Sequence, residues 1–221
     1  MNPEHANDRE SRRARVVVLL SGGGRTLANL LRCREAGVLP IDVVRVISTR
    51  KQILGNDVVL EAGIPLSLIP RRDYRTGEQF SDAVLAVIHA EAPDLVVMAG
   101  FLSKITIPDE LDGRVMNIHP ALLPFFGGQG YYGDHVHAAV LAAGMKVSGC
   151  TAHFVNNDYD AGPIIAQRCV PVLENDDVDS LAARVFACEC ELYPSAIRLF
   201  IEGRLRIEGN RVRVLPEDHA R

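Results

Sequence analysis

The sequence predicts a single α/β domain with a Rossmann-like, open and mostly parallel sheet, helices on both faces and a small C-terminal hairpin. Short apolar runs rich in Val, Ile and Leu, typical of strands buried on both faces, alternate with segments of helical periodicity. Alternation of this kind implies parallel strands. The 221 residues, of which 48% are hydrophobic, suffice for one substantial core.

The elements are expected in a regular order along the chain. The first strand is residues 15–20, and the glycine turn SGGGRT joins it to a helix that begins near Leu27. Further strands are expected at 41–48, 66–70, 94–101, 114–120, 146–155 and 164–172, and further helices at 56–62, 78–90, 135–144 and 177–202. Residues 206–215 predict a hairpin that turns at Gly209-Asn210.

Polar and charged residues dominate both ends of the chain. A mobile N-terminal tail at 1–14 and a C-terminal tail at 216–221 are therefore expected to flank one domain of residues 15–215. The N-terminus has no apolar stretch of a signal peptide, and no apolar run approaches the roughly 20 residues that cross a bilayer. The sequence predicts a cytoplasmic protein with no membrane partner, as a monomer or homodimer.

The net charge and the cysteines bear on the partners and on the redox state of the protein. A net charge of -4 and a pI near 6.0 provide no basic surface for nucleic acid, so no nucleic-acid partner is expected. Five cysteines, an odd number in a chain without an export signal, are expected to be reduced thiols.

The segment RVMNIHPALLP, residues 114–124, places polar groups at the end of a buried strand. Asn117 and His119 are two residues apart, so their side chains share one face of the strand. Open parallel sheets bind ligands beyond the carboxyl ends of their strands, which makes this pair a candidate for chemistry. The alternative is that His119 merely caps a loop.

The turn SGGGRT allows a ligand to approach the backbone closely, and the following helix presents free N–H groups to an anion. A phosphate site is the favoured interpretation, and Arg25 would add a charged hydrogen bond. A dinucleotide site fits less well, because Leu27 occupies the third glycine position and no acid ends the second strand. A plain tight turn remains the other alternative.

Asp160 lies in the polar loop NNDYDAGP between two apolar strands. Aspartate is common in turns, and this is the simpler interpretation. A carboxylate that reaches an imidazole, however, orients the ring and favours its protonated form, which is useful for polarising a carbonyl. Asn117, His119 and Asp160 would then form one catalytic group.

Two further features are open to more than one interpretation. His135, His137 and His153 do not have the spacing of a zinc site, since positions i and i+2 of a helix diverge, and no metal is expected. The segment FFGGQGYYG, residues 125–133, is either a lid over the site or an ordinary flexible loop.

Six motifs together resemble those of the folate-dependent formyltransferases over roughly residues 15–215: SGGGRTL, MAGFLSKI, NIHPALLP, GCTAHFV, DYDAGPIIAQ and ELYP. The resemblance implies transfer of a formyl group from 10-formyltetrahydrofolate to the amine of a phosphoribosylated glycinamide in purine biosynthesis. Both ligands would be small molecules, and Asn117, His119 and Asp160 match the family's catalytic trio.

The resemblance also implies which residues bind the two substrates. Those for the acceptor are Gly24, Arg25 and Thr26 at its phosphate and Glu189 near its amine; those for the donor are Leu102, Ser103, Lys104, Ile105, Asn117, Asn156, Asn157, Asp158 and Tyr159. The family commonly has an arginine where this chain has Ser103, and another near Gly77 that contacts the donor's charged tail. Lys104 and Arg75 are the candidate substitutes.

Other functions remain as alternatives at this stage. One is a formyltetrahydrofolate hydrolase, and another is a formyltransferase for a different small phosphorylated or sugar-nucleotide amine. A non-enzymatic sensor of phosphoribosyl compounds or nucleotides would use the glycine turn but would not need the trio. The relatives that formylate initiator tRNA or hydrolyse the donor have an additional domain, for which 221 residues leave no room.

Overall fold

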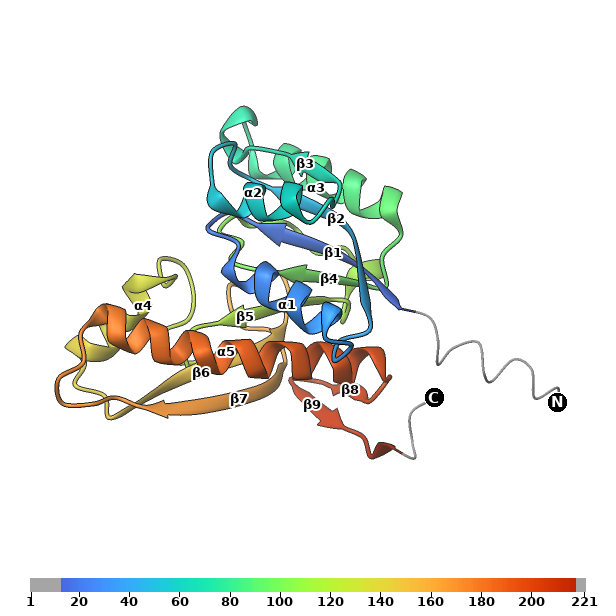
Figure 1. Cartoon of the computed structure of the whole chain (residues 1–221). Helices are drawn as coiled ribbons and strands as arrows, with labels where there is room; N and C mark the ends of the chain where they lie inside the picture. The colour runs from blue at the N-terminus through green and yellow to red at the C-terminus, as the bar shows by residue number, and fades with distance from the viewer. Residues whose placement is uncertain (1–12, 218–221) are drawn as a thin grey trace.

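The computed structural model describes residues 13–217, which form one sheet of nine strands with helices packed against it (Figure 1). The strands are β1 (Ala14–Leu20), β2 (Ile41–Ser48), β3 (Leu66–Leu68), β4 (Leu95–Met98), β5 (Val115–His119), β6 (Val147–Phe154), β7 (Ile164–Pro171), β8 (Leu205–Glu208) and β9 (Arg211–Val214). Each strand expected from an apolar run is present, and most ends differ from the predicted ones by a few residues.

Helices connect most of these strands, as the alternating pattern predicts. They are α1 (Arg25–Glu35), α2 (Leu54–Glu61), α3 (Gly77–Glu91), α4 (Asp134–Ala142) and α5 (Val178–Ile201), with short 3-10 turns η2 (Arg71–Asp73) and η3 (Asp109–Leu111). Side-chain caps begin two of the long helices. Thr76 accepts a hydrogen bond from the backbone of Gln79 in α3, and Asp177 forms a capping box with Ser180 in α5.

The strand order is β3-β2-β1-β4-β5-β6-β7-β9-β8. The five strands from β3 to β5 are parallel, and β6 pairs antiparallel with both β5 and β7. β8 and β9 form the expected antiparallel hairpin, with Gly209 at its turn in a left-handed conformation of φ +61°. The predicted fold class, an open and mostly parallel sheet with a C-terminal hairpin, is confirmed.

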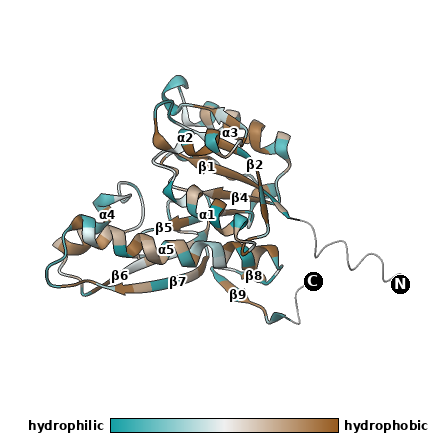
Figure 2. Ribbon diagram, viewed as in Figure 1, coloured by the Kyte–Doolittle hydropathy of each residue, from teal (hydrophilic) through white to brown (hydrophobic). Residues whose placement is uncertain are grey.

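The alternation of side chains along the central strands creates two hydrophobic cores. Val16, Val18 and Leu20 of β1 face the first core, which also contains side chains of α1, α2, α4 and α5. Val17 and Leu19 face the second core, beneath α3 and the segment after β4. Figure 2 shows the central strands β1 and β4 as continuously hydrophobic, as expected for strands covered on both faces.

Helix α5 continues through Pro194, which has no N–H to bond the carbonyl of Cys190 four residues earlier. The side-chain amide of Asn29 in α1 bonds that carbonyl instead, at 2.9 Å. The hydroxyl of buried Tyr193 lies 3.0 Å from the carbonyl oxygen of Met98 and 2.9 Å from that of Met116, and donates to both. These bonds fix α5 against α1 and against the ends of β4 and β5.

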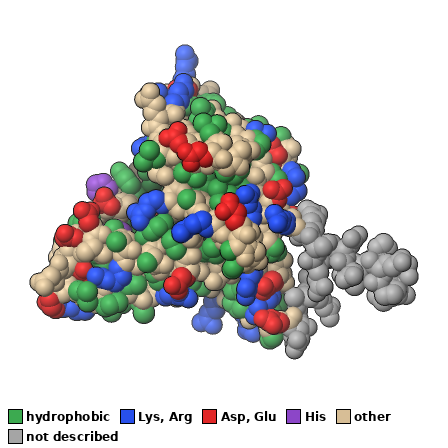
Figure 3. All heavy atoms as spheres, in the orientation of Figure 1, with side chains coloured by type: hydrophobic (Ala, Val, Ile, Leu, Met, Phe, Trp, Pro, Cys, Tyr) green, Lys and Arg blue, Asp and Glu red, His purple; other side chains and the backbone are tan. Residues whose placement is uncertain are grey.

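The expectations of no membrane partner and no nucleic-acid partner concern the helices and the charged surface. No helix among residues 13–217 is long and apolar enough to cross a membrane. On the face drawn in Figure 3, Lys and Arg side chains are interspersed with Asp and Glu. Residues 1–12 and 218–221, which hold most of the two predicted tails, lie outside the part of the chain that the structure describes.

Candidate active site

A cavity of about 320 Å³ opens at the carboxyl ends of β4 and β5. Its walls come from the strand ends, the segment after β4, the loop before α4 and the loop between β6 and β7. Its lining includes Met98, Leu102, Ser103, Lys104, Ile105, Asn117, His119, Tyr131, Tyr132, His153, Asn156, Asp158, Tyr159 and Asp160. The location is the one expected for a ligand of a parallel sheet.

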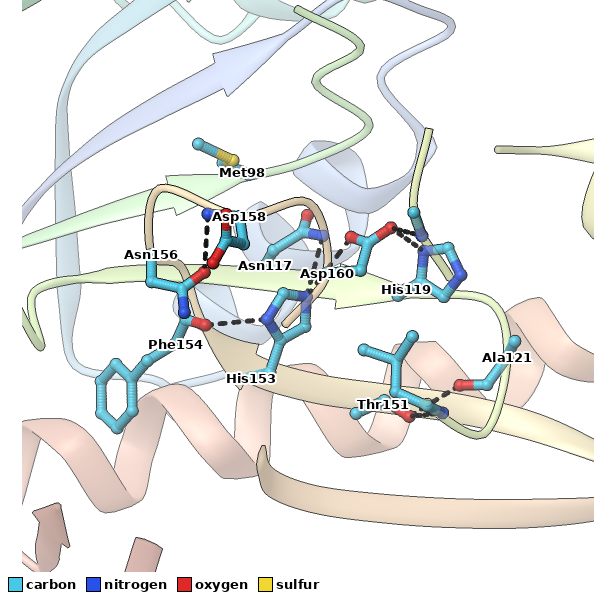
Figure 4. A network of polar contacts seen from close by, with 12 residues as sticks. Met98, Asn117, His119, Ala121, Thr151, His153, Phe154, Asn156, Asp158 and Asp160 are labelled. Carbon is cyan, nitrogen blue, oxygen red and sulfur yellow. Dashed lines mark hydrogen bonds and ion pairs between the residues drawn. The ribbon is translucent and has the colours of Figure 1, made fainter. Parts of the chain in front are cut away.

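The structure brings the predicted trio together at this cavity (Figure 4). The Asp160 carboxylate lies between the two histidine rings, with Oδ2 3.6 Å from Nδ1 of His119 and Oδ1 3.8 Å from Nε2 of His153. Asp160 has a left-handed backbone with φ +51°, which aspartate tolerates better than most residues. The carboxylate therefore reaches the imidazole of His119, as the functional interpretation of Asp160 requires.

His153 determines the orientation of the Asn117 amide. Nδ1–H of His153 donates to the carbonyl of Phe154 at 2.8 Å, and burial lowers the pKa of His153 more strongly than the Asp160 carboxylate raises it. The ring is therefore neutral, and its unprotonated Nε2 accepts a hydrogen bond from Nδ2 of Asn117 at 3.2 Å. One N–H of the Asn117 amide is thus fixed, and the second is left for a ligand.

The loop of residues 125–133 is bonded to His119 and Asp160. Nε2–H of His119 donates to the carbonyl of Phe126 at 2.8 Å, and the N–H of Gly128 donates to Oδ2 of Asp160 at 2.9 Å. Nε2 of His119 thus faces the Phe126 carbonyl, and its Nδ1 faces the Asp160 carboxylate. Whether this loop opens and closes stays a prediction, but its backbone is part of the site.

The turn that follows β5 is held by side chains of β6 and β7, of which Thr151 is buried. The Thr151 hydroxyl donates to the carbonyl of Ala121 at 2.6 Å and accepts from the N–H of Leu123 at 3.1 Å. Gln167 donates both to that hydroxyl and to the carbonyl of Leu123, at 2.9 and 2.8 Å. These bonds fix the chain directly after His119 without using any group of the trio.

Most residues predicted to bind the donor line the cavity. Leu102, Ser103, Lys104, Ile105, Asn156, Asp158 and Tyr159 do so. Asn157 is not among the lining residues, because its amide bonds the backbone N–H and carbonyl of Ile107 at 2.8 and 3.1 Å. Lys104 places its Nζ 4.9 Å from the ring centroid of Tyr159, so the two walls of the cavity meet there.

The residues predicted to bind the acceptor lie outside this cavity, at the N-terminus of α1 and on α5. Gly24 is the N-cap of α1, with φ +75°, and an added Cβ would lie 2.7 Å from the Cα of Gly55. Arg25 and Thr26 begin the helix, and no acidic residue occurs in its first turn. Burial raises the pKa of Glu189 to about 7, although the positive charge of Arg25 opposes the shift.

The three histidines that follow the central strand do not form a metal site. His135 is exposed on α4, whereas His137 and His153 are buried in different elements. Within residues 13–217, no three His, Cys, Asp or Glu side chains are placed to hold an ion.

Sequence reasoning missed several residues that build the site. His153 was considered only as a metal ligand or a packed histidine, and Tyr193 only as part of the ELYP motif. The bonds to Phe126 and Gly128 use backbone groups, whose positions no residue type reveals. His153 lies on β6 opposite Asn117 in the sheet register, a pairing visible only once β5 and β6 are known to be neighbours.

The fold and this cluster of an amide, two imidazoles and a carboxylate define an α/β enzyme that acts at the carboxyl ends of its strands. Residues 14–197 match the formyl transferase family. The chain therefore belongs to the formyl transferase family.

The chain is similar to several proteins of known name. It is 40% identical over 199 residues to the chloroplastic phosphoribosylglycinamide formyltransferase of Vigna unguiculata, and 37% identical over 212 residues to the trifunctional purine biosynthetic protein adenosine-3 of Bos taurus. These matches cover 88% and 95% of the chain but span only 63% and 20% of the two relatives. The crystal structure of glycinamide ribonucleotide transformylase 1 from Symbiobacterium toebii superposes with a TM-score of 0.85 at 40% identity, covering 92% of this chain and 95% of that one.

Proposed function

We propose that the chain transfers the formyl group of 10-formyltetrahydrofolate to the amine of glycinamide ribonucleotide in purine biosynthesis. The main supporting observation is that Asn117, His119 and Asp160 line one cavity. The walls of this cavity include the two segments expected to hold the donor, residues 102–105 and 156–159. Membership of the formyl transferase family and the names of the plant and Symbiobacterium relatives support the proposal. A cytoplasmic location and a monomeric or homodimeric state stay predictions.

The Asn117 amide and the His119 ring are suited to the charge that develops in this reaction. Attack of the acceptor's amine on the formyl carbon places negative charge on the formyl oxygen, which needs hydrogen-bond donors. Asn117 offers its second amide N–H, because His153 holds the first. Nε2–H of His119 is the other donor, and the formyl oxygen takes the place of the Phe126 carbonyl that accepts this bond in the structure.

Asp160 and His119 supply the proton transfers. One C–N bond forms between the acceptor's nitrogen and the formyl carbon, and the bond from that carbon to the donor's nitrogen breaks. Asp160 accepts the proton from the attacking nitrogen, directly or through a water, and His119 is the acid of the trio that protonates the leaving nitrogen.

A cationic hollow adjoins the catalytic cavity, and the two share Leu102 and Ser103. Its basic lining residues are Arg50, Lys51, Arg71 and Arg72. The donor's charged tail is proposed to extend toward this hollow, which supplies the positive charge missing at Ser103. Lys104 contacts Tyr159, and Arg75 is not among the lining residues, so the hollow is favoured over both of them as the substitute.

The decisive test is an assay with both substrates. Purified protein, 10-formyltetrahydrofolate and glycinamide ribonucleotide should give tetrahydrofolate rapidly, and omission of the acceptor should leave little turnover. Equal turnover without the acceptor would identify a hydrolase and contradict the proposal. Absence of turnover would also contradict the proposal, and an assay with other phosphorylated or sugar-nucleotide amines would then separate a formyltransferase for another acceptor from a sensor.

A thermal-shift experiment tests the donor pocket separately. A folate analogue at about 100 times its Kd should stabilise the protein by roughly 2.7 kcal/mol, which is visible as a rise in Tm. NAD and NADP should give no shift, because the glycine turn lacks the dinucleotide spacing. Protection by NAD but not by folate analogues would exclude a folate pocket.

A further inference from the structure

The guanidinium of Arg25 lies over the aromatic ring of Phe186, with Cζ 3.8 Å from the ring centroid. Among residues 13–217, no hydrogen bond or ion pair of this guanidinium is found, and Arg25 is exposed. Contact through the face of the guanidinium leaves the N–H groups at its edge free for a ligand. The side chain is therefore held in position without using its hydrogen-bond donors.

The position of the pair follows from the contact between α1 and α5. Asn29 bonds the Cys190 carbonyl that Pro194 leaves free. Arg25 precedes Asn29 by four residues and Phe186 precedes Cys190 by four residues, so each lies on the same helix face as its neighbour. A hydrogen bond one turn away thus aligns the arginine with the ring, and α1 and α5 lie side by side in Figure 1.

Arg25 is an unfavourable residue for the helix that it begins. The N-terminus of a helix carries partial positive charge, so a cation there is destabilising, and α1 has no acidic residue in its first turn to compensate. Gly24, the N-cap, provides no side-chain hydrogen bond. A residue that destabilises its own helix, as Arg25 does here, is expected at a functional site such as one that binds an anion.

We infer that Phe186 is a positioning residue, whose ring holds Arg25 where it binds the phosphate of the acceptor. This inference rests on the proposed function, together with the expectation from the glycine turn SGGGRT that the acceptor's phosphate binds at the N-terminus of α1. A free arginine samples many rotamers and loses this freedom on binding, whereas an arginine already stacked on a ring loses less. The ring acts on acceptor affinity through Arg25 and has no contact with the reacting atoms.

Substitution of the ring tests this role. Phe186→Leu keeps an apolar side chain but removes the aromatic face, and the acceptor KM should rise about two- to fivefold, with kcat and the donor KM unchanged. Phe186→Tyr should retain the original acceptor KM. The matched control is Phe200→Leu on the same helix, where the ring contacts Phe154 and no cation, and this variant should leave the acceptor KM unchanged.

A double-mutant cycle separates positioning from a structural effect. In an Arg25→Met background, Phe186→Leu should cause no further rise of the acceptor KM. An equal rise in both backgrounds would overturn the inference, and so would a Phe186→Tyr variant that behaves like Phe186→Leu.

Binding of inorganic phosphate, measured by calorimetry, does not depend on turnover. Phe186→Leu should weaken it by the same two- to fivefold. Equal phosphate affinity of the two proteins, or no phosphate binding to the unsubstituted protein, would overturn the inference. If the protein binds phosphate as expected but does not formylate glycinamide ribonucleotide, the proposed function fails while the role of Phe186 stands.

Discussion

The catalytic cavity and the N-terminus of α1 differ in how far the protein satisfies its own polar groups. At the cavity, Asn117, His119 and Asp160 each have a hydrogen-bond partner within the chain. At the N-terminus of α1, no hydrogen bond or ion pair of the Arg25 guanidinium is found among residues 13–217, and burial holds the Glu189 carboxyl near neutrality. The chain thus orients the proposed reacting groups by itself, whereas the proposed acceptor end has donors left for a ligand.

The difference follows from the elements that carry each region. The cavity lies at the end of two paired strands, where the register between β5 and β6 sets Asn117 opposite His153. The proposed acceptor end lies between the N-terminus of α1, whose first N–H groups have no partner within the helix, and the middle of α5. Substitutions should therefore reduce catalysis at the first region and substrate affinity or pH response at the second.

The largest effect on activity is expected from Asp160→Asn at the cavity. The amide cannot take the proton of the attacking amine, so kcat should fall by at least about 10², or about 2.7 kcal/mol. The acceptor and donor KM should change little, because the interaction is made mainly in the transition state. Steady-state kinetics with each substrate varied would show this.

Asp109→Asn is the matched control for that substitution, since Asp109 is exposed in η3 and lies outside the cavity. Its kinetics should be those of the unsubstituted protein. An Asp160→Asn enzyme with an unchanged kcat would show that the carboxylate has no part in the chemical step.

The second effect concerns the pH dependence of stability at the acceptor end. Glu189 has a folded pKa of about 7, raised from 4.5 by burial, so the folded state holds a proton that the unfolded state has lost between these pH values. Stability should therefore decrease as pH rises from about 4.5 to 7, by about 3 kcal/mol for this group. Glu189→Gln should remove that loss.

The measurement is the difference in unfolding free energy between the two proteins, from urea titrations at several pH values. The difference is needed because buried His137 and His153 have lowered pKa values, which reduce stability as pH falls and so act in the opposite direction. Parallel curves for the two proteins over pH 4.5 to 7 would show that Glu189 does not titrate in this range.

The third effect is expected from Arg25→Glu at the N-terminus of α1. The substitution removes a charged contact to the acceptor's phosphate and adds repulsion, and the acceptor KM should rise about thirtyfold, or about 2 kcal/mol. The donor KM should not change, which distinguishes the two regions. Exposed Arg211 provides a matched control, because Arg211→Glu lies on the hairpin strand β9. An unaltered acceptor KM in a folded Arg25→Glu protein would place the phosphate elsewhere.

Much of the fold was predictable because its signals are local. Buried parallel strands such as β1 are continuous apolar runs, and helices such as α3 begin at a residue suited to capping. The pairing of β6 with β5 and the bonds of the loop at 125–133 were not predictable, because both depend on contacts between residues distant in the sequence.

The candidate site divides in the same way. Asn117 and His119 are recognisable because they interrupt an apolar strand, and the glycine turn because of its spacing. The functional interpretation of Asp160 was supported mainly by the resemblance to a family, since aspartate is common in turns. The role of His153 depends on a cross-strand partner, and that of Phe186 depends on the register of two helices, which Asn29 and Pro194 determine together.

The smallest effect should come from His153→Phe, which tests how the cavity orients its own groups. The ring keeps its approximate size but loses the nitrogen that accepts from the Asn117 amide, so the amide can rotate. A hydrogen bond of this kind contributes about 1 kcal/mol, and kcat should fall about fivefold. In an Asn117→Ala background the same substitution should have little effect on kcat, because the amide that His153 orients is absent. If the two reductions of kcat simply multiplied, His153 would act independently of Asn117. The orientation of the Asn117 amide would then not depend on His153.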